Sequence, residues 1–172
     1  MRGRYWLVYL ILVAAQILLG NFLNLGQMVS ICLLPVLILS LPIGMKAPWV
    51  MVLAFLTAFA VDFFTHGILG LGVVALLPVA AGRTLLVSAV FGGEVFSRGE
   101  DISVHKQGLP KIALAILIAT AVFFAIYVWV DAAGTRSFGF NALRWLASTA
   151  ASTLAQVFLA GLLTDREEGR WK

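Results

Sequence analysis

Residues 47–64 read APWVMVLAFLTAFAVDFF, and this stretch decides the fold class. Only one of its side chains, Asp62, carries a charge. An α-helix rises about 1.5 Å per residue and needs about 20 apolar residues to cross the hydrocarbon core of a bilayer. Lipid offers no hydrogen-bond partner to the backbone, so a helix is the expected conformation. The stretch therefore predicts a transmembrane helix.

Five further apolar stretches of similar length lie on either side of this one. The six predicted helices cover residues 5–23, 28–44, 47–64, 69–91, 112–130 and 140–163. The chain of 172 residues is 62% hydrophobic and 12% charged, whereas a soluble domain is about a quarter charged. We therefore expect an all-α membrane protein, a single polytopic domain over residues 1–172 folded as a compact six-transmembrane-helix bundle.

The distribution of Lys and Arg predicts the orientation. If the helices alternate across the bilayer, nine of the twelve basic residues share the side of the N-terminus. They are Arg2, Arg4, Lys46, Arg98, Lys106, Lys111, Arg166, Arg170 and Lys172. Arg136 alone falls on the other side. Such a bias marks the cytoplasmic face, so both termini and the loop 92–111 are expected in the cytoplasm. The basic residues form no continuous stripe, which argues against nucleic acid as a partner.

Ionisable residues inside the predicted helices are candidate functional residues, because burying them in lipid is costly. Asp62 either has such a role or caps a turn at the outer interface. Arg83 either extends its head towards the cytoplasm or pairs with a carboxylate such as Asp62. After Asp62, three glycines at positions Gly67, Gly70 and Gly72 predict a sharp turn between two helices.

Small residues recur at a spacing of four in the last predicted helix. Ala147, Ala151 and Ala155 share one face, with Ser148 and Ser152 beside them. This spacing lets helix backbones approach closely. The alanines are interpreted as packing inside the bundle, or alternatively as a seam for the helix of a partner. Arg144, one turn into the same helix, is expected to extend to the outer face.

Known catalytic and cofactor motifs are missing from the sequence. It contains no G-x-S-x-G, H-E-x-x-H, P-loop or dinucleotide fingerprint, and its two histidines and single cysteine, Cys32, do not have the spacing of a metal site. We therefore expect no cofactor, no metal and no enzymatic activity.

The chain resembles the MreD family, the rod shape-determining membrane proteins of bacteria, over nearly its whole length. The resemblance rests on Pro35 in the second helix, Pro48 opening the third, Asp62, and the motif Gly67-x-x-Gly70-Leu71-Gly72-x-x-Ala75-Leu76. It implies a non-enzymatic scaffold of the cell-elongation complex in the bacterial inner membrane, which binds the single-span protein MreC. It also implies a wider complex with MreB, RodA and a class B penicillin-binding transpeptidase.

The same resemblance implies a fold similar to the substrate-binding components of energy-coupling-factor transporters. A vitamin-binding transporter component is therefore the alternative function, and it would need an outward cavity with convergent polar groups. An intramembrane enzyme acting on lipid-linked precursors is a third possibility. The sequence leaves open whether the chain forms homo-oligomers.

Overall fold

The computed structural model describes residues 2–22, 28–42, 44–65, 68–92 and 108–168. Within these ranges the chain forms helices and no strands. The helices are α1 (Arg2–Phe22), α2 (Leu34–Leu39), α3 (Ala47–Phe64), α4 (Leu71–Phe91), α7 (Leu109–Ala132) and α8 (Phe138–Glu168). The prediction of an all-helical chain is confirmed.

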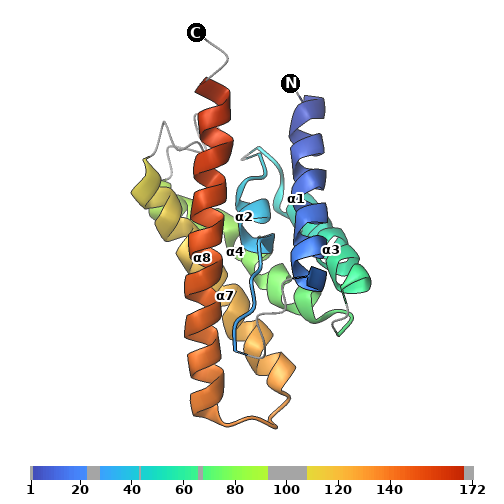
Figure 1. Ribbon diagram of the computed structural model, residues 1–172. Helices are drawn as coiled ribbons and strands as arrows, with labels where there is room; N and C mark the ends of the chain where they lie inside the picture. The colour runs from blue at the N-terminus through green and yellow to red at the C-terminus, as the bar shows by residue number, and fades with distance from the viewer. Residues whose placement is uncertain (1, 23–27, 43, 66–67, 93–107, 169–172) are drawn as a thin grey trace.

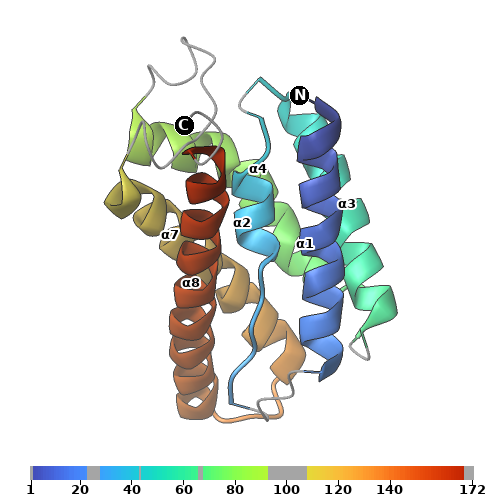
Figure 2. The same ribbon diagram turned by 45° about the horizontal axis from the view of Figure 1, so that its top comes forward.

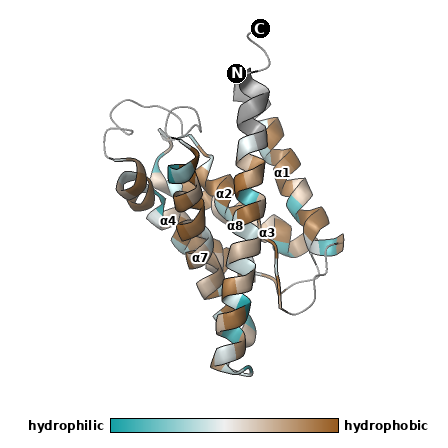
Figure 3. Ribbon diagram, turned by 60° about the vertical axis from the view of Figure 1, so that its left-hand side comes forward, coloured by the Kyte–Doolittle hydropathy of each residue, from teal (hydrophilic) through white to brown (hydrophobic). Residues whose placement is uncertain are grey.

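Three of these helices, α3, α4 and α7, are long and apolar enough to cross a membrane. Many large apolar side chains on the outside of the bundle are exposed, for example Leu10 on α1, Phe55 on α3 and Leu85 on α4. Figure 3 shows hydrophobic residues over most of α3, α4 and α7, while α8 is paler, with hydrophilic turns. These features are those of a membrane protein, because water would not tolerate so many exposed apolar side chains.

The helices surround a short central one. α4 packs against both α3 and α7, and α7 packs against α8, while α1 lies against α3 (Figures 1 and 2). All six residues of α2 are buried, and it contacts α1, α3, α4 and α7. The beginning of α1 and the end of α8 lie at the same end of the bundle, and the turn between α7 and α8 lies at the other (Figure 1).

The second predicted helix, 28–44, is wrong over most of its length. Of the described residues in this range, only Leu34–Leu39 are helical, and residues 28–33 run as a non-helical segment between α1 and α8 (Figure 2). Pro35 is in the first turn of α2. Proline has no N–H and disfavours the helical conformation in the residue before it, so it starts helices more readily than it continues them. Each of the other five predicted ranges coincides with one helix, with ends shifted by a few residues.

Candidate functional site at the interrupted segment

The non-helical segment Met28–Leu33 is bonded to α8 by side chains instead of by a partner strand. The Ser30 N–H donates to Ser148 Oγ at 3.0 Å, and the Cys32 N–H donates to Ser152 Oγ at 3.0 Å. The Ser152 hydroxyl in turn donates to the Ser30 carbonyl at 3.2 Å. Gln156 Nε2 donates to the Cys32 carbonyl at 2.7 Å. Both backbone groups of Ser30 and of Cys32 are therefore satisfied by α8.

The spacing of these α8 residues matches the spacing of the chain that they hold. Four residues of an α-helix rise about 6.0 Å. Two residues of an extended chain rise about 6.6 Å. A polar residue at every fourth position of α8 can thus meet every second residue of the segment, and Ser148, Ser152 and Gln156 do so at Ser30 and Cys32.

The opposite edge of the segment is bonded by α1. Gln16 Oε1 accepts from the Leu33 N–H at 2.7 Å, and Gln16 Nε2 donates to the Ile31 carbonyl at 3.4 Å. On the α8 side, Thr120 of α7 donates to Gln156 Oε1 at 3.2 Å and so holds that amide in place. We call the five side chains that bond the segment or support these bonds the polar clamp. They are Gln16, Thr120, Ser148, Ser152 and Gln156.

The polar clamp makes it possible for non-helical backbone to lie inside a membrane protein. A buried backbone group without a partner costs about 1–3 kcal/mol. Irregular backbone is therefore found at membrane depth only where protein or a water-filled cavity surrounds it. Every clamp residue is at least nine-tenths buried. The clamp's hydrogen bonds to Cys32 and Leu33 form away from solvent, while those to Ser30 and Ile31 are partly buried.

Arg83 of α4 binds the end of α2. The side chain is buried and its guanidinium donates to the carbonyl of Leu41, two residues beyond the helix. A buried backbone carbonyl outside a helix needs a hydrogen-bond partner, and a cation interacts favourably with the C-terminal end of a helix. The contact supplies a role for Arg83 that neither sequence interpretation anticipated.

Asp62 caps the beginning of α4. Its Oδ2 accepts from the N–H of Gly70 at 3.0 Å and from the N–H of Gly72 at 2.9 Å. Gly70 has a φ of 89°, and a Cβ on Gly72 would lie 2.5 Å from Asp62 Oδ1. A carboxylate is favourable at this end of a helix. The structure therefore places Asp62 in the capping role, while Gly67 lies outside the described residues.

The face of α8 that holds the segment is the serine face rather than the alanine face. Ala147, Ala151 and Ala155 are partly buried, whereas Ser148 and Ser152 are fully buried. Sequence reasoning noted these serines only as neighbours of the alanines and did not select Gln16, Thr120 or Gln156. The available signal was a polar residue at every fourth position of this helix, 148, 152 and 156.

Arg144 contacts the α7–α8 end of the bundle, the end that the sequence predicts to be outer, but its guanidinium is not exposed there. Arg144 is buried and forms an ion pair with Asp131 at the end of α7. Nearby on α8, Trp145 Nε1 donates to the Ala121 carbonyl of α7 at 2.9 Å. These contacts fasten the α7–α8 hairpin, which stands on the side of the segment opposite α1 (Figure 2).

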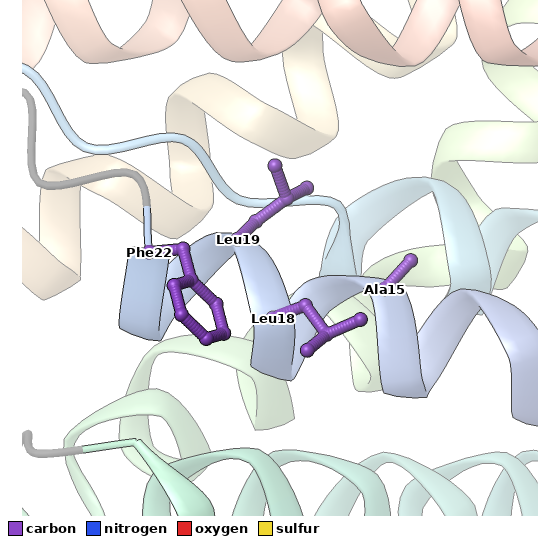
Figure 4. A pocket seen from close by; sticks show the side chains of 4 residues that line it. All are labelled: Ala15, Leu18, Leu19 and Phe22. Atoms are coloured by element: carbon purple, nitrogen blue, oxygen red, sulfur yellow. The ribbon is translucent and has the colours of Figure 1, made fainter.

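An apolar hollow of about 430 Å³ lies along α1. It is lined by Ala15, Leu18, Leu19 and Phe22. Figure 4 shows Leu19 directed towards the non-helical segment, while Leu18 and Phe22 point the other way. Its lining offers apolar contact and no side-chain hydrogen bond, which suits a lipid chain or an apolar helix better than a polar small molecule.

Comparison of the chain with family models, with curated proteins and with solved structures finds no match.

Proposed function

We propose that this chain is a non-enzymatic scaffold of the bacterial cell-elongation complex, as the resemblance to the MreD family implies. In this role it binds the membrane helix of an MreC-like single-span protein and supports lateral peptidoglycan synthesis and cell shape. MreB, RodA and a class B penicillin-binding transpeptidase complete the assembly. The observation that carries the proposal is the interrupted segment between α1 and α8.

The described residues of the chain do not fully cover the segment. Met28 is 42% exposed, and Ser30 and Ile31 are partly exposed. Because irregular backbone is not left open to lipid, another protein segment is the natural cover. On the α8 side, the partly exposed Ala147 and Ala151 would let a helix approach closely.

The proposal includes six crossings of the inner membrane, the second of which is only partly helical. Residues 28–32 span about 17 Å if extended, and Leu33 with the six residues of α2 adds about 10 Å at the helical rise. The sum of about 27 Å is close to the hydrocarbon thickness of about 30 Å. An even number of crossings agrees with the beginning of α1 and the end of α8 lying at one end of the bundle (Figure 1), the end that the positive charges assign to the cytoplasm.

The use made of the buried polar groups supports a structural role. In the described residues, the interior hydroxyls and amides of the polar clamp bind the chain's own backbone, and Asp62 caps a helix. A catalytic constellation needs a nucleophile and a base free to meet a substrate. The groups named above are already hydrogen-bonded to backbone groups of the chain.

Cysteine crosslinking to a co-expressed MreC-like partner tests the proposal. In a Cys32→Ala background, Met28→Cys and Ala151→Cys should crosslink to cysteines in the partner's membrane helix. Leu117→Cys, on the exposed face of α7, is the matched control and should not. If the partner never co-purifies, the proposed function fails. If it co-purifies but crosslinks mainly through Leu117, only the assigned surface fails.

A vitamin-binding transporter component remains the second candidate. Discontinuous membrane segments are where many transporters build their substrate sites, and the Met28–Leu39 region is such a segment. A vitamin that co-purifies with the protein, or that raises its melting temperature, would favour this candidate. A flat response across a vitamin panel, with retention of an MreC-like partner, would exclude it.

A further inference from the structure

The turn between α7 and α8 brings three charged side chains together. Asp131 is near the end of α7, Arg136 lies in the turn, and Arg144 is in the second turn of α8. Both guanidinium groups contact the same carboxylate oxygen. Arg136 Nη1 lies 3.5 Å from Asp131 Oδ2, and Arg144 Nη1 donates to that same atom. The three side chains together carry one excess positive charge.

This cluster has too few hydrogen-bond acceptors. Each guanidinium offers five N–H donors, whereas Asp131 supplies one carboxylate. Among the described residues, Arg144 Nε is buried without a hydrogen-bond acceptor, and Arg136 Nη1 is buried and has only the ion-pair contact with Asp131, at 3.5 Å. A buried donor without an acceptor is costly, and more so in surroundings of low dielectric constant. The cluster is therefore suited to receive a further anionic oxygen.

Arg136 is the member of the cluster that an external group can reach. Its side chain is 31% exposed, compared with 9% for Arg144. The guanidinium carbon lies 5.6 Å from the centre of the Phe140 ring, which restricts the side chain. A restricted, partly exposed guanidinium can present its free edge to a ligand at a low entropic cost.

The cluster lies where a membrane-spanning helix ends. α7, which is long and apolar enough to cross a bilayer, ends at Ala132. The rings of Trp129 and Phe138 meet edge to face there, with centroids 5.9 Å apart, and both are exposed. Aromatic rings of this kind sit at the level of the lipid headgroups. The anionic oxygens available at that level are the phosphates of phospholipids.

We propose that Arg136, supported by Arg144 and Asp131, binds the phosphate of a phospholipid headgroup at the α7–α8 end of the bundle. Two N–H groups on one edge of a guanidinium match two phosphate oxygens, so the contact is bidentate. The charge distribution of the sequence places this end in the outer leaflet. The inference depends on α7 crossing the membrane and is independent of the proposed partner.

Native mass spectrometry of the full chain in detergent tests the site, with phosphatidylglycerol as the probe. We expect Arg136→Gln to reduce the retained lipid by about fivefold or more, the factor that corresponds to about 1 kcal/mol. Arg136→Lys keeps the charge but loses the planar fork, and should retain an intermediate amount. Lys46→Gln, which removes an exposed basic residue before α3, is the matched control and should bind as the unaltered chain does.

Three results would overturn the inference. In the first, Arg136→Gln retains as much lipid as the unaltered chain. In the second, Lys46→Gln loses lipid equally, which would indicate non-specific attraction. In the third, millimolar inorganic phosphate displaces the lipid, which would make free phosphate the ligand. If Arg136→Gln does not fold, the comparison of Arg136→Lys with Lys46→Gln decides, and equal retention by these two variants would refute the site.

Discussion

Replacing Ser152 by alanine should open the interrupted segment. The substitution removes one oxygen atom that accepts from the Cys32 N–H and donates to the Ser30 carbonyl. The Cys32 N–H then loses its partner in a buried place, and the Ser30 carbonyl loses its partner in a partly buried one. At about 1–3 kcal/mol for a buried unsatisfied group, the folded arrangement of the segment should lose about 2 kcal/mol in total.

Cys32 provides the assay, because it is the single cysteine of the chain and is only 7% exposed. A thiol reagent can reach it only when the segment opens, so the rate of labelling measures the opening equilibrium. A loss of 2 kcal/mol corresponds to about a 30-fold faster labelling rate in Ser152→Ala, since each 1.4 kcal/mol is a factor of ten. The measurement uses the purified protein in a mild detergent.

Thr153→Val is the matched control. Thr153 follows Ser152 on α8, and its hydroxyl is buried without a hydrogen-bond partner among the described residues. Valine has nearly the shape of threonine, so only the unused hydroxyl is lost and the labelling rate should change by less than about twofold. Equal rates for Ser152→Ala and Thr153→Val would refute the reasoning that the polar clamp holds the segment.

Three further outcomes follow from the contacts. Gly72→Ala should lower the stability of the bundle by about 1 kcal/mol or more, because its Cβ would displace the capping carboxylate of Asp62. Gly82→Ala in the same helix meets open space and should be neutral or stabilising. Thermal unfolding in detergent compares the two variants. Gln16→Leu should accelerate thiol labelling as Ser152→Ala does, since it frees the other edge of the segment. Asp131→Asn should lower the melting temperature, because the buried guanidinium of Arg144 is then left without its counter-charge. Arg136→Gln, which removes the partly exposed member of the same cluster, should not lower it.

The short motif on which the resemblance to MreD rests includes Asp62, Gly70 and Gly72, and the structure gives a local reason for these three residues. Asp62 and Gly72 belong together because the carboxylate occupies the space that a side chain at position 72 would fill. Gly70 adopts a left-handed conformation, which glycine accepts without strain. A pattern of this kind is explained by local geometry and carries no information on catalysis.

The helix ranges at 47–64, 69–91 and 112–130 followed from the sequence because apolar length alone decides whether a segment can cross a bilayer. The role of Asp62 was open between function and capping, and contacts decided it in favour of capping. The prediction of a helix over 28–44 was wrong because a short apolar run has the same hydropathy whether its backbone is helical or extended. Pro35 was a signal for a helix start that hydropathy does not register.

The sequence by itself determined the helical class and three of the segments that are long and apolar enough to cross a membrane, since these depend on composition along a single segment. The sidedness of the charges stays a prediction. Only the tertiary structure decided that residues 28–33 leave the helical conformation. Their backbone groups need partners from α1 and α8, which lie more than a hundred positions apart in the chain. A non-helical crossing is stable only when such distant side chains replace the hydrogen bonds that a helix would make for itself.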